Sequence, residues 1–226
     1  TPIKSSAASD VYKRQELNVC IDSDDMMAKD GVEKILTAWE NVRNKGYAGL
    51  IALDADFEGN IIGKRFPEAM KETTLGGYYA SGGKGDKKLI YRTDVIKSVP
   101  AYPVFKGEKY TGLSYKYIVV DQQYKLFVLN EVVCNVEYQE DGSSNTMYLQ
   151  YLKNPNGFAF MRRVNLMYPT SKKRLLMECI HYCSSSQIAH NRNYIKESPR
   201  KALTILCTPL GWCLTAYIRR KARMER

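Results

Sequence analysis

Three aspartates within four positions are the residues of this sequence best suited to chemistry. Asp22, Asp24 and Asp25 directly follow a short apolar run at residues 17–21. Carboxylates this close together repel one another unless a cation is present. Oxygen ligands of this kind suit Mg²⁺ or Mn²⁺, and such a metal usually also bridges substrate phosphates. Because open α/β sheets bind ligands at the carboxyl ends of their strands, the position favours a metal–diphosphate site.

Two other structures compete with a metal–diphosphate site. One is a helix N-terminus, where acidic residues are favoured. The other is an EF-hand loop, because Asp22, Asp24 and Glu33 have the spacing of its positions one, three and twelve. Met26 and Met27 stand where that loop needs an oxygen ligand and a glycine, which excludes it. The spacing alone leaves the metal site and the helix cap open.

The elements that must position these acids follow an α/β pattern. Apolar runs predict strands at residues 17–21, 47–53, 88–91, 126–129 and 132–138. Helices are predicted from Asp30 onward, over 73–80 and 113–120, and over most of the chain from Met147, with a break near Pro199. Asp30 and Glu33 have the spacing of a capping box. Strands that alternate with helices indicate an α/β fold.

The charge is distributed unevenly. The net charge is +10; residues 1–154 carry 20 Lys+Arg and 21 Asp+Glu, whereas residues 155–226 carry 14 and 3. A segregated basic end is typical of proteins that meet an anionic surface, either membrane or nucleic acid. No basic motif interleaved with aromatic residues is present, so we expect no nucleic-acid partner.

The C-terminal end favours the membrane. Residues 202–218 are mostly apolar and precede a basic tail at 219–226. About 17 residues is the lower limit for a spanning helix, and we expect Pro209 and Gly211 to interrupt it. A helix in the membrane interface, with basic residues on anionic head groups, fits better. A core helix with a solvated basic tail is the alternative.

The six cysteines form no disulfide framework and lie mostly in apolar runs, which indicates reduced thiols and a cytosolic protein. Cys179, His181 and Cys183 resemble a metal motif, but no second ligand pair is near, so we expect them to pack. The 17 tyrosines suit a site for sugars or a strand-rich core equally.

A family resemblance extends the acidic motif. The segment VCIDSDD at residues 19–25 resembles the D-x-D segment of family 2 glycosyltransferases. Six further segments, in order, resemble a bacterial cell-surface or capsular polysaccharide subgroup of that family: AGLIALD (48–54), GKRFP (63–67), GDKKLIYR (85–92), PVFKGE (103–108), VEYQEDG (136–142) and SPRKALTI (198–205). The resemblance covers residues 16–226. It implies a partial GT-A fold, which is Rossmann-like with a mixed sheet flanked by helices, plus C-terminal helices.

The same resemblance implies roles for individual residues. Asp22 and Asp24 would bind Mg²⁺ or Mn²⁺, and Asp25 would join them around the diphosphate of a sugar nucleotide. Glu108 matches the first acid of a G-E-D motif whose acidic pair includes the base for the acceptor hydroxyl. Lys109 replaces the second acid. The implied activity is inverting transfer from a nucleotide-diphosphate sugar to a glycan or lipid-linked acceptor, in the cytoplasm at the inner face of the cell membrane.

Two separate resemblances predict a division of the chain. Residues 10–15 resemble the translation of a synthetic DNA adapter, so we expect residues 1–15 to be non-native. Residues 16–146 would be the metal and acceptor part of the GT-A domain, and residues 147–226 a helical basic region. The first βα units of the fold have no counterpart, so we expect an inactive chain with exposed apolar edges near residues 17–21 and 50–53.

Two other functions stay open. One is a nucleotidyltransferase-like enzyme, which shares the use of a metal and a diphosphate. The other is a non-catalytic module that binds membrane surfaces through the basic third. Only an enzyme needs Asp22, Asp24 and Glu108 around one cleft.

Overall fold

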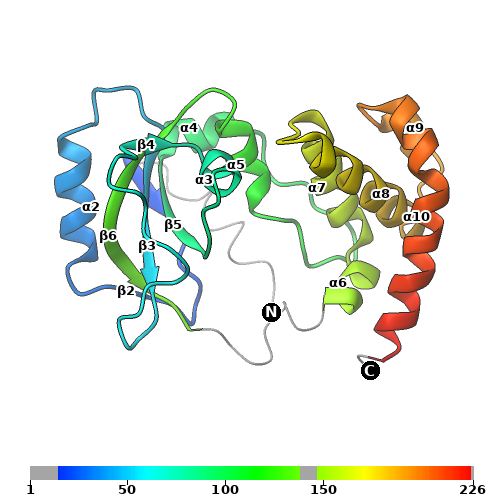
Figure 1. Cartoon of the computed structure of the whole chain (residues 1–226), viewed down its shortest axis with the longest axis horizontal. Coiled ribbons are helices and arrows are strands. Elements are labelled where there is room, and N and C mark those ends of the chain that lie inside the picture. Colours follow the sequence, from blue (N-terminus) through cyan, green and yellow to red (C-terminus); the bar gives the residue numbers. More distant parts are fainter. Residues whose placement is uncertain (1–14, 138–146, 225–226) are drawn as a thin grey trace. The chain divides into compact units, whose positions relative to one another are not determined.

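The computed structural model describes residues 15–137 and 147–224, so the segment expected to be non-native lies outside the described residues except for Gln15. The chain forms two compact units. Within the described residues, unit 1 consists of 15–101 and 116–137, and unit 2 of 102–115 and 147–224. Unit 1 contains the sheet and unit 2 is helical (Figure 1). The loop that carries Glu108 therefore belongs to unit 2.

A mixed sheet forms the centre of unit 1. Its strands are β1 (Leu17–Val19), β2 (Met26–Met27), β3 (Gly49–Ala55), β4 (Glu72–Thr73), β5 (Lys87–Arg92) and β6 (Leu126–Asn135). Their order is β1-β5-β3-β6-β2, with β4 also paired to β6. Strands β3 and β6 are parallel, and the other pairs are antiparallel. The expected α/β class, with a mixed sheet flanked by helices, is confirmed.

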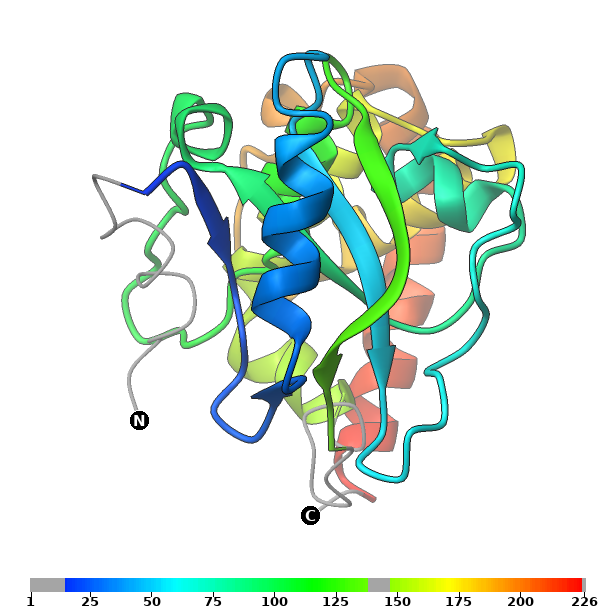
Figure 2. The same ribbon diagram turned by 90° about the vertical axis from the view of Figure 1, so that its left-hand side faces the viewer.

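Helices lie on both faces of this sheet. They are α2 (Gly31–Glu40), α3 (Leu75–Ala80), α4 (Thr93–Ser98) and α5 (Ser114–Val120). Helix α2 packs Ile35 and Trp39 into a core with Leu50 of β3, and Figure 2 shows it lying across that face. On the other face, Tyr117 of α5 stacks on Tyr91 of β5 with 5.1 Å between ring centroids.

Two sequence expectations for unit 1 are wrong. Residues 50–53 are not an exposed edge, because β3 is hydrogen-bonded to β5 on one side and β6 on the other and is buried throughout. Asp30 precedes α2 but makes no side-chain cap, since its carboxylate pairs with Lys34 Nζ at 2.9 Å. The first strand does lie at one end of the strand order, with half-buried side chains.

Strand β6 joins two runs that the sequence predicts as separate strands. Its register along β3 shifts: Ala52 lies opposite Leu129, but the next residue, Leu53, lies opposite Val132. The two residues skipped form a bulge, and one of them, Asn130, clamps a distant loop. Its side chain accepts a hydrogen bond from Phe66 N at 3.2 Å and donates one to Phe66 O at 3.0 Å.

Unit 2 contains α6 (Met147–Lys153), α7 (Pro155–Met167), α8 (Lys172–Ile188), α9 (Tyr194–Glu197) and α10 (Lys201–Ala222). The predicted break near Pro199 is confirmed, since it separates α9 from α10. The expected interruption at Pro209 and Gly211 is wrong, because α10 is continuous through both. A Cβ on Gly211 would lie 2.5 Å from Cys183 Cβ, so glycine permits the close approach of α10 to α8.

The cysteines of unit 2 pack in its core. Cys179, Cys183 and Cys207 are buried together with Leu166 and Tyr182, and all six cysteines of the chain are free thiols. The packing expected for Cys179 and Cys183 is therefore confirmed. His181, between them, is half-buried near Tyr151, and desolvation, followed by the charge of Arg162, lowers its pKa to about 4.

Candidate active site

The three aspartates lie where the chain turns at the end of β1. Asp25 N donates to Asp22 O at 3.1 Å, which closes a tight turn before β2. Asp22 and Asp24 are exposed, whereas the side chain of Asp25 is largely buried. The pairing of β1 with β5 and of β5 with β3 places this turn at the sheet end where β3 finishes. The acids therefore follow the first strand, as the sequence indicates, and lie at the sheet end where the buried strand β3 finishes.

A buried lysine links this turn to the centre of the sheet. Lys88 Nζ lies 3.3 Å from Asp25 Oδ2 and 3.7 Å from Asp54 Oδ1. Lys88 lies opposite Ala52 in the β3–β5 ladder, on the same face as Asp54 two residues further along. The three side chains are almost fully buried, with exposures of 10% for Lys88, 11% for Asp25 and 3% for Asp54.

The acids of this cluster are electrostatically crowded. Burial raises the pKa of Asp54 to about 6; Lys88 opposes the shift and Asp25 adds to it. Burial also raises the pKa of Asp22, and the charge of Asp25 raises it further, against the effect of Lys88. One lysine thus serves several carboxylates, and an additional cation would relieve their mutual repulsion.

The carboxylates of the turn suit a metal ion whose other ligands come mainly from the substrate. Within residues 15–137 and 147–224, no group of three His, Cys, Asp or Glu side chains is arranged to hold a metal ion. Magnesium, however, is commonly bound through one or two carboxylates plus phosphate oxygens and water. Lys88 neutralises Asp25 and Asp54, whereas the exposed Asp22 and Asp24 offer two carboxylates of this kind.

Glu108 lies in unit 2, where its carboxylate contacts the start of α7. Its Oε1 accepts hydrogen bonds from Asn156 N at 2.9 Å and Asn156 Nδ2 at 2.6 Å, and its Oε2 accepts one from Gly157 N at 2.8 Å. A carboxylate in this place satisfies helix N–H groups that otherwise lack partners. Glu108 therefore has a structural role, and the expectation that it shares a cleft with Asp22 and Asp24 stays a prediction.

The same loop is attached to α7 a second time. Asn154, the residue before the helix, accepts hydrogen bonds on Oδ1 from Lys109 N at 2.8 Å and Tyr110 N at 3.1 Å. The Tyr110 ring stacks on Phe158 with 4.6 Å between centroids. Lys109, which replaces the second acid of the G-E-D motif, is exposed. The loop is thus fixed against the start of α7 by Glu108 itself and by the two residues that follow it.

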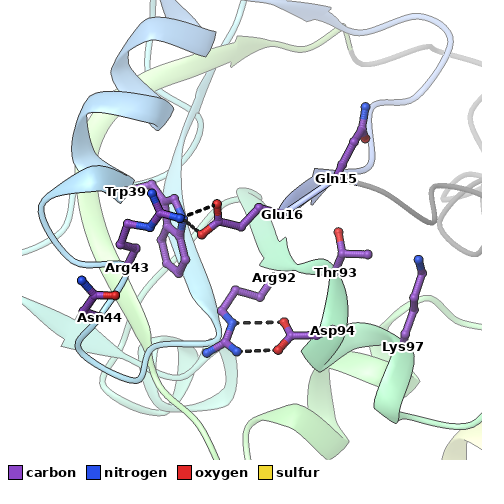
Figure 3. A pocket seen from close by; sticks show the side chains of 9 residues that line it. All are labelled: Gln15, Glu16, Trp39, Arg43, Asn44, Arg92, Thr93, Asp94 and Lys97. Atoms are coloured by element: carbon purple, nitrogen blue, oxygen red, sulfur yellow. Dashed lines mark hydrogen bonds and ion pairs between the residues drawn. The ribbon is translucent and has the colours of Figure 1, made fainter.

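A pocket lies at the other end of the sheet. This pocket of about 600 Å³ is lined by residues such as Glu16, Arg43, Arg92 and Asp94 (Figure 3). Glu16 accepts from Trp39 Nε1 at 2.9 Å and pairs with Arg43 at 3.1 Å, while Arg92 pairs with Asp94. The charges of these four side chains are therefore satisfied in pairs. The pocket lies where β3 begins, away from the three aspartates.

Sequence reasoning missed Asp54 and Lys88. Each had a signal: Asp54 is the only charged residue in the apolar strand GLIALDA, and Lys88 lies in the half-apolar strand KKLIYR. A charged side chain in a buried strand needs a partner. The partner itself could be identified only from the pairing of β3 with β5, because the two residues are far apart in sequence.

The comparisons with known proteins give a fold class and a particular structural relative. No protein-family model matches the sequence, and no curated protein matches it. The mixed sheet flanked by helices is a glycosyltransferase-like fold. The chain is similar to Staphylococcus aureus TarS 1–349 in complex with UDP-GlcNAc, with a TM-score of 0.51, 12% identity, and coverage of 98% of this chain and 71% of that chain.

A second TarS 1–349 structure matches with a TM-score of 0.43 and 12% identity, over 98% of this chain and 70% of that one. TarS is a glycosyltransferase. Since only 12% of aligned residues are identical, the similarity establishes the fold, and the role of each residue must be argued from this chain.

Proposed function

We propose that this chain is part of an inverting, metal-dependent glycosyltransferase of family 2, in the subgroup that builds bacterial cell-surface polysaccharides. The donor would be a nucleotide-diphosphate sugar and the acceptor a glycan or a lipid-linked glycan. The observation that carries the proposal is the aspartate turn beside the buried Asp54–Lys88 pair, at the carboxyl end of β3 in a glycosyltransferase-like fold. The TarS complex with UDP-GlcNAc supports a donor of this class.

In this proposal, each acid has a separate task. Asp22 and Asp24 would hold Mg²⁺ or Mn²⁺, which supplies positive charge for the leaving diphosphate. Asp25 is held in place by Lys88 and orients the turn. The acceptor hydroxyl oxygen attacks the anomeric carbon, the bond from that carbon to the diphosphate oxygen breaks, and Glu108 takes the hydroxyl proton. Attack opposite the leaving group inverts the anomeric configuration.

We also propose that the protein works in the cytoplasm at the inner face of the cell membrane. The supporting observation is the concentration of basic residues in the last third of the chain. A lipid-linked acceptor would be met at that surface.

The products of the reaction test the proposed class of enzyme. The complete protein that carries this chain is expected to release a nucleoside diphosphate from a nucleotide-diphosphate sugar when Mn²⁺ or Mg²⁺ is present, and EDTA should abolish the release. Chromatography of the nucleotides after incubation with a panel of donors measures it. Release of pyrophosphate from a nucleoside triphosphate and a sugar phosphate would instead identify a nucleotidyltransferase. No turnover of any donor would overturn the proposal.

Two substitutions separate the possible roles of Glu108. Glu108→Ala removes three hydrogen bonds at the start of α7, so it should lower the free energy of unfolding by about 1–2 kcal/mol. Glu108→Gln keeps an amide oxygen as an acceptor and should destabilise the protein less. As the proposed base, Glu108 cannot be replaced by Gln without loss of turnover, on the order of a hundredfold or more.

Urea unfolding and donor turnover, measured on both variants, distinguish these effects. If Glu108→Gln retains transfer within a few fold of the unmodified protein, Glu108 is a helix cap and another group is the base.

A further inference from the structure

Helix α10 has two faces of different character. One face packs inside unit 2 and consists of mostly small or polar residues: Thr204, Cys207, Gly211, Thr215, Ile218 and Ala222. The opposite face is apolar and open, with exposures of 75% for Leu206, 50% for Leu210 and 47% for Tyr217. Their spacing places these three on one side of the helix. Ile205 and Trp212, also exposed, flank them, and together these five residues form the outer face of α10.

The outer face leads directly into a basic cluster. Arg219, Arg220 and Lys221 occupy the last turn of α10, and Arg223 follows as its C-cap. No acidic residue occurs between Lys201 and Met224 to neutralise them. Basic side chains beside an apolar helical face match a bilayer that carries anionic head groups, because the chains enter the interface while the charges stay at the phosphates.

The packing of α10 distinguishes an interfacial helix from a spanning one. By length and hydropathy, α10 could cross a membrane, and only 28% of its most apolar window is buried. However, its inner face is bonded to α8: Ser184 Oγ and Thr215 Oγ1 lie 2.9 Å apart, and Cys183 Sγ lies 3.5 Å from Thr204 O. Figure 1 shows α10 running alongside α8.

Helix α8 could not follow α10 into hydrocarbon. It begins with Lys172, Lys173 and Arg174, which are exposed, and it carries the buried Glu178. Charged residues are costly at the centre of a bilayer. A spanning α10 would therefore have to give up its contacts with α8, whereas an interfacial α10 keeps them.

We propose that the outer face of α10 is a docking surface for an anionic lipid bilayer, on which the helix lies in the interface without crossing it. The partner is the lipid surface itself, recognised by the apolar residues and by the basic cluster at the end of the helix. This inference deepens the membrane location proposed above. It rests on unit 2 alone and does not depend on the proposed sugar transfer.

Intrinsic fluorescence can follow this docking directly. The chain has two tryptophans; Trp39 is buried in unit 1 with 3% exposure, whereas Trp212 on the outer face is 62% exposed. Vesicles of equimolar phosphatidylcholine and phosphatidylglycerol should shift the emission to shorter wavelength and sediment with the protein. Vesicles of phosphatidylcholine alone should do so weakly. Raised salt should release the protein, because it screens the basic cluster.

Substitutions on the two parts of the surface complete the test. Leu206→Glu on the outer face should abolish the emission shift, whereas Leu36→Glu on α2, at an exposed leucine of unit 1, should leave it unchanged. Replacing Arg219 and Arg220 by Gln should weaken binding to the anionic vesicles roughly thirtyfold. Circular dichroism of each variant should match the unmodified protein, since all these side chains lie outside the core.

Four results would overturn the proposal. The first is that the protein does not bind anionic vesicles, and the second is that Leu206→Glu does not affect binding. The third is that the bound protein resists extraction by alkaline carbonate, which would indicate a spanning helix. The fourth is binding of duplex DNA, or dimerisation in sedimentation, that occludes Trp212 without any vesicle binding.

Bromine-labelled lipids should quench Trp212 most strongly when the bromine is near the head group.

Discussion

Replacement of Asp24 by Ala in the complete protein that carries this chain should reduce sugar transfer by roughly a hundredfold to a thousandfold. A metal at a leaving diphosphate contributes several kcal/mol of charge stabilisation, and each 1.36 kcal/mol corresponds to a factor of ten in rate. Asp24 is exposed and lies outside the core, so the free energy of unfolding should change by less than about 0.5 kcal/mol. A loss of activity without a loss of stability would mark a functional residue.

Three measurements on this variant make the argument specific. Donor turnover gives the rate, urea unfolding gives the stability, and Mn²⁺ titration followed by electron paramagnetic resonance gives the metal affinity, which should fall with the rate. Asp30→Ala is the matched control, because Asp30 is a nearby exposed acid that pairs with Lys34 at the surface. Transfer retained within threefold in Asp24→Ala would rule out a metal site at this turn.

Replacement of Lys88 by Met should destabilise unit 1 by about 3–5 kcal/mol at neutral pH. The substitution leaves two buried carboxylates, Asp25 and Asp54, without their shared cation, and breaking a buried ion pair by removing one partner has this order of cost. The comparison variant is Lys125→Met. Lys125 pairs with Glu72 at the surface, where the lysine side chain is 60% exposed, so its loss should cost less than about 1 kcal/mol.

The destabilisation caused by Lys88→Met should depend on pH in a defined direction. Burial raises the pKa of Asp54 to about 6 from 3.8, so between these values the folded state binds more protons than the unfolded state. The contribution of Asp54 to stability therefore increases as pH falls through 6 and diminishes as pH rises. Without Lys88, which holds that pKa down, the dependence should be stronger.

Urea unfolding at pH 7.5 and pH 5 measures this dependence. The difference in stability between Lys88→Met and the unmodified protein should shrink at the lower pH, and adding Asp54→Asn should restore part of the loss at pH 7.5. A difference that is the same at both pH values would show that the titration of Asp54 plays no part in the effect of Lys88 on stability.

The sequence was sufficient to locate the aspartate turn and to identify the fold class. Asp22 to Asp25 follow an apolar run, and such a run in an α/β pattern ends at the ligand-binding side of the sheet. The buried pair was out of reach, because nothing local indicates that Lys88 faces Asp54. That fact depends on the antiparallel register of β5 against β3, which is set by tertiary packing.

Glu108 shows the converse case. Its G-E motif pointed to it as a candidate base, yet the motif contains no information on the start of α7, almost fifty residues further along. The central position of β3 was missed for a related reason. Its seven buried residues are compatible with an edge or a centre, and only the return of β6 as a parallel neighbour decides between them.

The bulge in β6 has a consequence for how unit 1 opens and closes in solution. Asn130 is skipped in the pairing with β3. Its side-chain amide bonds the backbone N–H and C=O of Phe66, as a neighbouring strand would, and Arg65 Nη1 donates to Asn130 O at 3.3 Å. The loop around Phe66 thereby shares the protection of the central sheet, because its amide can exchange with solvent only when this clamp breaks. A surface connection and an inner strand are thus joined into one cooperative segment.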